Sequence, residues 1–242
     1  SRSYYLSNGK WPVSCIIRVP TGAYGSGGPY HSSSVESILT NIHGIKIAYP
    51  SNAADLKGLI KSAYYDPNPV VILEHKGLYW GKMKGTEETK TLEPDENYLL
   101  PFGIAKTVLN ASEKSLNEGK SLCIVTYGMG IYWSKLAAKK FNNQIEIIDL
   151  RTLYPLDEKY VYEKVKTHSN CIVVSEEPHS NSFAQSLASK ISQNCFNYLD
   201  SAVSVIGSEN LPAIPLNSIL EERMLPNPQK IEIEIKDKLN IK

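Results

Sequence analysis

Short runs of aliphatic and β-branched residues alternate along this chain with stretches whose apolar residues have helical spacing. Apolar strands separated by helices are typical of parallel sheets covered on both faces. We therefore predict an α/β fold with two three-layer α/β/α domains, each built on a mainly parallel sheet. The predicted strands are residues 13–19, 44–49, 70–74, 121–126, 144–150, 170–175 and 203–206. The predicted helices are residues 35–42, 54–63, 131–141, 158–167, 183–193, 216–223 and 231–242.

The 242 residues are enough for two domains of ordinary size. Between the two alternating regions the sequence changes character, because Lys82 to Lys90 is charged and rich in threonine and Pro94 to Asn97 is a loop sequence. We predict domains at 1–95 and 119–242, joined by a linker at 96–118, with short strands near 98–103.

Charge and cysteine content narrow the class of protein. With 26 Lys and Arg against 25 Asp and Glu, the net charge of +1 gives no electrostatic reason to expect nucleic acid or an anionic membrane as a partner. The sequence contains no run of eighteen apolar residues that would predict a membrane-spanning helix. Cys15, Cys123, Cys171 and Cys195 are far apart, so we predict reduced core cysteines of a cytoplasmic protein.

A glycine-rich loop, Thr21 to Glu36, connects the first predicted strand to the first predicted helix and contains His31. Ligands of open α/β sheets bind at the carboxyl ends of the strands, and an imidazole can transfer protons near neutral pH. The spacing Ser33-x-x-Glu36 predicts a capping box at the start of the helix. From residue types alone, His31 is either a proton-transfer residue or a hydrogen-bonded structural histidine.

The other polar candidates receive structural interpretations. His43, His75 and His168 lie at the ends of predicted elements, where a histidine most often serves packing or hydrogen bonding. The string Glu176-Glu177-Pro-His179 ends a predicted strand, and we interpret it as a candidate for subunit contacts and not for catalysis.

Several strings go beyond these general patterns, and they occur in one order along the chain. They are Arg18-Val-Pro-Thr-Gly, Tyr30-His31-Ser32, Ile45-Lys-Ile-Ala-Tyr-Pro50-Ser, Ala54-Asp-Leu-Lys-Gly-Leu59, Asp66-Pro-Asn-Pro-Val-Val-Ile-Leu-Glu74, Leu78-Tyr79, Val125-Thr-Tyr-Gly, Ile148-Asp-Leu-Arg-Thr-Leu-Tyr-Pro-Leu-Asp157, Val173-Val-Ser-Glu-Glu177 and Leu220-Glu-Glu-Arg-Met-Leu-Pro226. Together they resemble the β subunit of thiamine-diphosphate-dependent 2-oxo acid dehydrogenases. The resemblance implies the C-terminal half of a pyrimidine-type cofactor-binding domain at 1–95 and a transketolase C-terminal domain at 119–242.

The resemblance implies a function in oxidative decarboxylation of pyruvate or a branched-chain 2-oxo acid, followed by reductive acylation of a lipoyl group. His31 matches the family's active-site histidine, which lies near the thiazolium ring and the lipoyl arm. The family has His-Ser-Gln where this chain has His31-Ser32-Ser33, so the hydrogen bonding next to the histidine differs here. Tyr30 is more similar to the branched-chain enzymes.

The resemblance also implies a structural potassium ion. It would be held by the backbone carbonyls of Cys15, Ala63, Tyr64, Asp66 and Asn68, close to a helix end where unpaired carbonyls and the helix dipole favour a cation. The alternative is a plain helix end before Asp66-Pro67.

Thiamine diphosphate and magnesium are the other cofactors that the resemblance implies, and both would be held mainly by parts not in these 242 residues. The family's cofactor-binding glutamate matches nothing here and is expected upstream of Ser1. The Gly-Asp-Gly…Asn motif of the magnesium site does not occur in the sequence. The cofactor-binding residues of this chain itself are therefore left unassigned.

We therefore expect the chain to be a C-terminal piece of a longer β subunit or of an α–β fusion, and to be inactive alone. The implied partners are an α subunit or α-type domain, a second β copy and a lipoyl-bearing acyltransferase. Two alternatives remain open: a dimerisation and assembly module without chemistry, and a relative of transketolase or deoxyxylulose-phosphate synthase.

Overall fold

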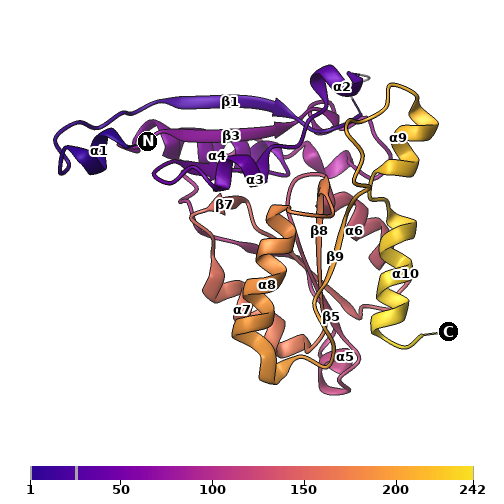
Figure 1. Ribbon diagram of the computed structural model, residues 1–242. Coiled ribbons are helices and arrows are strands. Elements are labelled where there is room, and N and C mark those ends of the chain that lie inside the picture. Colours follow the sequence, from indigo (N-terminus) through magenta and orange to yellow (C-terminus); the bar gives the residue numbers. More distant parts are fainter. Residues whose placement is uncertain (1, 25–26, 242) are drawn as a thin grey trace.

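Two sheets form the framework of the molecule (Figure 1), and the computed structural model describes residues 2–24 and 27–241. The strand order is β1-β3-β2-β7 in the first sheet and β4-β6-β5-β8-β9 in the second. The strands are β1 (Ile16–Thr21), β2 (Lys46–Ala48), β3 (Val70–His75), β4 (Lys106–Leu109), β5 (Leu122–Thr126), β6 (Ile145–Asp149), β7 (Thr152–Tyr154), β8 (Cys171–Pro178) and β9 (Ser204–Ser208). The helices are α1 (Ser3–Leu6), α2 (Gly28–His31), α3 (Glu36–Thr40), α4 (Ala53–Tyr64), α5 (Glu113–Asn117), α6 (Gly130–Ala138), α7 (Glu158–His168), α8 (Phe183–Cys195), α9 (Ser218–Met224) and α10 (Pro228–Lys238).

The predicted α/β class is confirmed. β3 pairs in parallel with β1 and β2, and the second sheet is parallel across β6, β5, β8 and β9. In Figure 1, α7 and α8 cover one face of the second sheet while α6 and α10 cover the other. Among the described residues no helix is long and apolar enough to cross a membrane.

Side chains that alternate along β2 and β3 face two different cores, as the two-residue period of a strand requires. Ile72 and Ala48 pack beside Leu59 of α4. Ile47 and Leu73 belong instead to a core shared with the second half of the chain, which includes Val125, Leu150, Phe183 and Leu39 of α3. The two halves are therefore joined through a common apolar interior.

Two antiparallel strands extend the sheets at their edges. β7, which follows β6, leaves the second half and pairs with β2 of the first sheet, with Ile47 opposite Tyr154. β4 lies within the 96–118 stretch and pairs with β6. The strands predicted near 98–103 are wrong, since that segment is irregular and β4 begins at Lys106.

The helix starts differ in how they are capped. The side chain of Asn52 accepts a hydrogen bond from the Asp55 amide at 3.0 Å and so caps α4. The capping box at Ser33 and Glu36 is wrong, because Val35 is the residue before α3 and no side chain caps that helix. The prediction that all four cysteines are core residues is also wrong for one of them, because Cys15 is exposed whereas the other three are buried.

Candidate active site

His31 lies at the end of a loop that is closed at its base. Where β1 ends, the hydroxyl of Thr21 donates to the carbonyl of Ser33 at 2.6 Å, and the amide of Gly22 donates to the same carbonyl at 3.3 Å. Ser33 is therefore held against the end of β1, and α2 ends at His31 just before this closure. The imidazole side of the loop is exposed, so His31 is available to a group outside this chain.

A cavity of about 140 Å³ lies behind the loop. It is lined by Ser32, Ser34 and Glu176 on the polar side, and by apolar residues that include Ile214 and Met224. Ser32 is 1% exposed, and its hydroxyl has no hydrogen-bond partner among the described residues. The cavity is therefore formed between the loop that carries His31 and residues of the second half of the chain.

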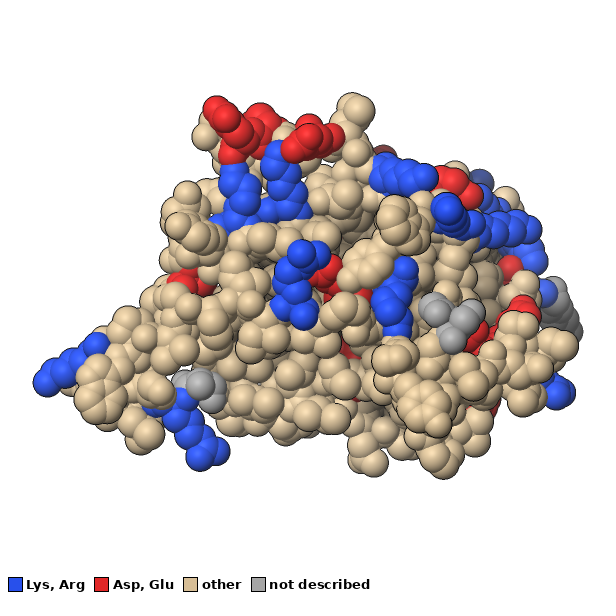
Figure 2. All heavy atoms as spheres, turned by 90° about the horizontal axis from the view of Figure 1, so that it is seen from above, with Lys and Arg blue, Asp and Glu red and all other residues tan. Residues whose placement is uncertain are grey.

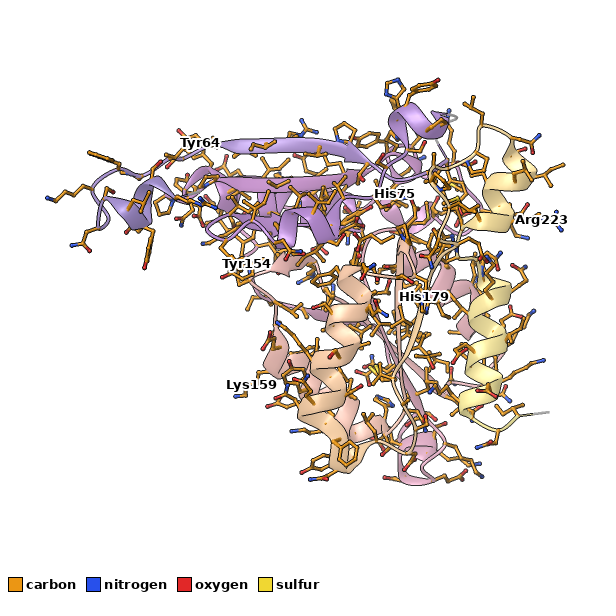
Figure 3. The ribbon with its side chains drawn as sticks, in the orientation of Figure 1. Tyr64, His75, Tyr154, Lys159, His179 and Arg223 are labelled. Carbon is orange, nitrogen blue, oxygen red and sulfur yellow. The ribbon has the colours of Figure 1, made fainter. Side chains whose placement is uncertain are left out.

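A histidine–glutamate pair lies beside this loop, between the ends of β3 and β8. The Nε2 atom of His75 is 2.7 Å from a carboxylate oxygen of Glu176, and both side chains are almost fully buried. Figure 3 shows His75 at the end of β3. The two residues are 101 positions apart, so no local spacing in the sequence could have revealed the pair.

Glu177 connects the two halves in a similar way. Its carboxylate accepts the amide of Ser37 in α3 and the amide of Phe183 in α8, each at 2.7 Å. Glu176 and Glu177 are 5% and 1% exposed, so the prediction that they make subunit contacts is wrong. Their carboxylates are used inside the chain, whereas His179 remains exposed.

Glu36 completes a group of three buried carboxyls. It is fully buried, and neither of its carboxyl oxygens has a hydrogen-bond partner among the described residues. Burial, together with the nearby charges of Glu177 and Glu176, raises the pKa of Glu36 well above its ordinary value of 4.5. Glu36 therefore keeps a proton in the folded chain over a pH range in which it would lose that proton in the unfolded chain.

Because Glu36 keeps this proton in the folded chain, we predict that the free energy of unfolding depends on pH. Since the folded state binds more protons than the unfolded state above pH 4.5, the free energy of unfolding falls as pH rises, by up to about 1.4 kcal/mol per pH unit. We expect Glu36→Gln, which cannot ionise, to remove this slope when unfolding by urea is measured from pH 5 to pH 8. The matched control is Glu163→Gln on the exposed surface of α7, which should keep the slope. An unchanged slope in Glu36→Gln would contradict the assignment.

The predicted potassium residues meet where α4 ends and β3 begins. The carbonyl of Cys15 accepts the amide of Val70 at 2.9 Å, and the carbonyl of Ala63 accepts the amide of Asp66 at 3.2 Å. Unpaired carbonyls at a helix end favour a cation, and the potassium site itself stays a prediction. Tyr64 is the last residue of α4.

The carboxylate of Asp66 is occupied by groups of the chain itself. One oxygen accepts the amide of Asn68 at 3.0 Å and the other is paired with the ammonium of Lys46. Burial alone would raise the pKa of Asp66, but the hydrogen bonds from Lys46 and Asn68 outweigh burial and lower it. A cation here would therefore bind carbonyls.

The predicted location of the cofactor-binding glutamate, upstream of Ser1, lies outside the part of the chain that the structure describes. Ser1 itself is also outside it, because the described residues begin at Arg2. The location of that glutamate therefore stays a prediction. Over residues 2–24 and 27–241, no three His, Cys, Asp or Glu side chains are arranged to hold a metal ion.

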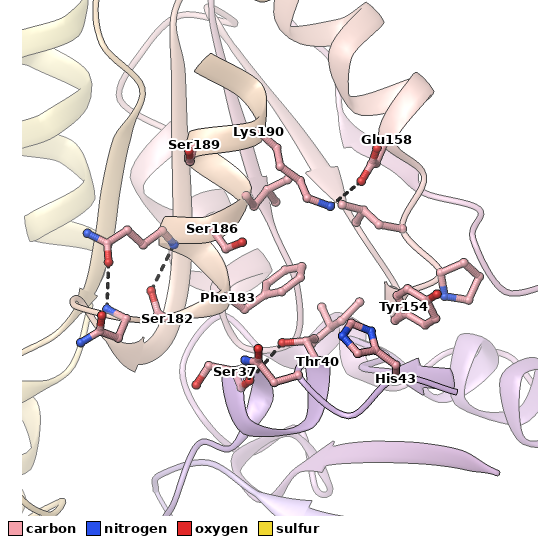
Figure 4. A pocket seen from close by; sticks show the side chains of 17 residues that line it. Ser37, Thr40, His43, Tyr154, Glu158, Ser182, Phe183, Ser186, Ser189 and Lys190 are labelled. Carbon is pink, nitrogen blue, oxygen red and sulfur yellow. Dashed lines mark hydrogen bonds and ion pairs between the residues drawn. The ribbon is translucent and has the colours of Figure 1, made fainter. Parts of the chain in front are cut away.

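The two other histidines with structural interpretations differ in surroundings. His168 is 2% exposed, and its ring nitrogens lie 2.9 Å from Ser121 and 2.9 Å from Glu146, so its structural interpretation is confirmed. His43 lines a groove of about 930 Å³ between α3, β7 and α8, shown in Figure 4. An ion pair of Lys190 with Glu158, 2.6 Å apart, lies at one side of this groove. The groove is separate from the cavity behind His31.

An exposed apolar surface lies around the free edge of the first sheet. We call it the β1 surface, and define it as Tyr5, Leu6, Trp11, Ile17, Tyr64 and Tyr65, which are between 48% and 86% exposed. Figure 2 looks down on the side of the molecule that carries β1; charged residues gather in several groups there, and a broad area between and below them bears none. An apolar surface of this kind is typical of a protein–protein contact.

Comparison with known proteins agrees with this architecture. Residues 1–81 match the transketolase pyrimidine binding domain, and residues 113–231 match the transketolase C-terminal domain. The chain is also similar in fold to a solved split gene transketolase described as an inactive beta4 tetramer. The TM-score is 0.68 at 15% sequence identity, over 96% of this chain and 68% of the other. At that identity the likeness shows the fold alone.

Curated relatives match almost the whole chain. The 2-oxoisovalerate dehydrogenase subunit beta of Bacillus subtilis is 32% identical over 96% of this chain and 68% of its own length. The pyruvate dehydrogenase E1 component subunit beta of Rhizobium meliloti is 31% identical over 98% of this chain and 48% of its own length. The chain thus spans about half to about two thirds of the length of these relatives. It belongs to the family of the β subunits of pyruvate and branched-chain 2-oxo acid dehydrogenases.

Proposed function

We propose that this chain is the β-type part of the decarboxylating component of a 2-oxo acid dehydrogenase, with units at 1–95 and 119–242, and that His31 transfers the proton needed in lipoyl acylation. The observation that carries the proposal is the position of His31. It is an exposed histidine in the loop after β1, at the edge where parallel strands of such sheets bind ligands.

The proposed reaction makes a definite demand on His31. The C1–C2 bond of the 2-oxo acid breaks to release carbon dioxide, and the electron pair stays with C2. C2 then forms a bond with one lipoyl sulfur while the sulfur–sulfur bond breaks. The second sulfur leaves with the bonding pair and takes a proton, which an imidazolium at His31 can donate. The products are an acyl thioester and a thiol, so the reaction consumes one proton overall.

Thiamine diphosphate, when bound, supplies the stabilisation of negative charge that decarboxylation requires. The exposed imidazole of His31 fits a cofactor that is held largely by another chain or domain, or by a glutamate upstream of Ser1. We also propose that the carbonyls of Cys15, Ala63, Tyr64, Asp66 and Asn68 hold a structural potassium ion, which would fix the end of α4 against the start of β3.

The proposed partners are an α-type subunit or domain that holds the diphosphate and magnesium, a second β copy, and a lipoyl-bearing acyltransferase. The β1 surface supports a large protein contact. Unpaired cysteines, three of them buried, agree with a reducing compartment such as the cytoplasm. The names of the relatives, together with Tyr30, support a branched-chain 2-oxo acid or pyruvate as substrate.

The proposal is tested by asking whether the full-length polypeptide that contains this chain, together with an α-type partner, acylates a lipoyl domain in the presence of a 2-oxo acid. We expect acylation by the complex and none by the chain alone. An assembly module would leave the lipoyl domain unchanged, and a relative of transketolase would transfer a ketol group between sugars.

A further inference from the structure

The loop that carries His31 is held mainly by the second half of the chain. The amide of Ala23 donates to Glu176 in β8 at 2.6 Å, and the amide of Tyr24 donates to Glu221 in α9 at 3.1 Å. At the start of α2, an added Cβ on Gly28 would lie 2.5 Å from Leu216. The loop therefore begins in the first domain, but its course is set by residues of the second.

Glu176 makes the most constrained of these contacts. One carboxylate oxygen accepts the Ala23 amide, and the other is 2.7 Å from Nε2 of His75. The Nδ1 atom of His75 accepts the amide of Gly77 at 3.1 Å, so the ring proton lies on Nε2 and is donated to Glu176. The carboxylate is thereby fixed in orientation from both sides.

The glycine at the start of the loop lies directly against this pair. An added Cβ on Gly22 would be 2.4 Å from the His75 ring, and the backbone φ of Gly22 is +82°. The other end of the loop is near Glu176 as well, because Glu176 and Ser32 line the same small cavity. One buried carboxylate thus contacts the loop at Ala23 and lines the same cavity as Ser32, the residue that follows His31.

We propose that Glu176, oriented by His75, is a positioning residue that holds the His31 loop in place for proton transfer. This inference rests on the proposed function of His31. Glu176 is buried and both of its oxygens are occupied, so it acts through the loop and does not touch the reacting groups. Loss of its two contacts frees the loop, and a displacement of about 1 Å in a proton donor can lower a rate by about 100-fold.

The test compares two activities of the assembled enzyme, which is the full-length polypeptide that contains this chain with its α-type partner. One is acylation of a lipoyl domain, and the other is decarboxylation coupled to an artificial two-electron dye, which needs no protonation of a lipoyl thiolate. We expect Glu176→Ala to lower acylation about 10- to 100-fold and to leave dye-coupled decarboxylation unchanged. The matched control is Glu222→Ala, an exposed glutamate of α9, which should change neither activity.

A double variant tests whether Glu176 acts through His31. If it does, Glu176→Ala combined with His31→Ala should be no slower in acylation than His31→Ala alone. Glu176→Gln gives a second comparison. Its side-chain oxygen can still accept the Ala23 amide, but its NH₂ group then faces the ring N–H of His75 and cannot accept from it. We expect the acylation rate of Glu176→Gln to lie between those of the wild type and Glu176→Ala, and this variant replaces Glu176→Ala if thermal melting shows that the alanine protein does not fold.

The outcomes distinguish the positioning role of Glu176 from the proton-transfer role of His31. Unchanged acylation in Glu176→Ala, or equal loss of both activities in a folded variant, would overturn the positioning role. Full multiplication of the two losses in the double variant would overturn it too. Unchanged acylation in His31→Ala would instead overturn the proposed function of the histidine.

Discussion

Replacement of His31 by alanine in the assembled complex is expected to lower the rate of lipoyl acylation by about 10²- to 10⁴-fold, the usual contribution of a positioned general acid. The imidazole is exposed at the end of the loop after β1, and removing it takes away the proposed proton donor without leaving a buried cavity. The measurement is the single-turnover rate at which a lipoyl domain gains an acyl group.

A second activity shows whether the loss of acylation in His31→Ala comes from proton transfer. Dye-coupled decarboxylation should survive in His31→Ala, because that reaction breaks no lipoyl disulfide. The melting temperature should also stay close to that of the wild type, because the side chain is exposed. His43→Ala is a matched control, since His43 lies in the groove beside α8 and away from the loop. Wild-type acylation by His31→Ala would show that the histidine is structural.

The largest expected loss of stability comes from a buried ion pair between the two halves of the chain. The Nε atom of Arg151 lies 3.0 Å from a carboxylate oxygen of Asp55 in α4, and the two side chains are 8% and 6% exposed. Asp55→Ala leaves the guanidinium buried without this carboxylate. We expect the free energy of unfolding in urea to fall by about 3–5 kcal/mol.

A double variant separates the cost of an unpaired charge from the value of the pair. Asp55→Leu combined with Arg151→Met removes both charges and keeps apolar volume at the contact, so most of the stability should return. A loss below about 1 kcal/mol in Asp55→Ala would mean that Arg151 finds another partner, and would contradict the importance of the pair.

The secondary structure could be predicted from the sequence where the signal is local. The apolar run at 70–74 and the helical spacing of Leu56, Leu59 and Ala63 lie within single elements, and the structure contains β3 and α4 there. β7 could not be found in this way, since it has three residues and is defined by pairing with β2, about a hundred positions earlier. The start of α3 was predicted to within one residue, since the helix begins at Glu36, but the capping box at Ser33 and Glu36 does not form.

The candidate site was predictable only in part. His31 came from a glycine-rich loop after a strand, combined with strings that match a family in order. His75 was correctly interpreted as a hydrogen-bonded structural histidine, but Glu176 could not be named as its partner, because their contact joins β8 to β3 and has no local signature. Glu36 resembled a helix-capping residue by its spacing, whereas tertiary packing buries it beside Glu177 and Glu176. Chemistry built across two halves of a chain is visible only once the sheets are in place.

The most direct test of the account is the mass of a lipoyl domain after incubation with the full-length polypeptide that contains this chain, its α-type partner, thiamine diphosphate, magnesium and a 2-oxo acid. Pyruvate and 3-methyl-2-oxobutanoate are compared as substrates. The account predicts that the lipoyl domain gains the mass of the acyl group left after loss of carbon dioxide, plus one hydrogen on the second sulfur. An unchanged lipoyl mass with every 2-oxo acid, together with ketol transfer between sugar phosphates by the same complex, would contradict it.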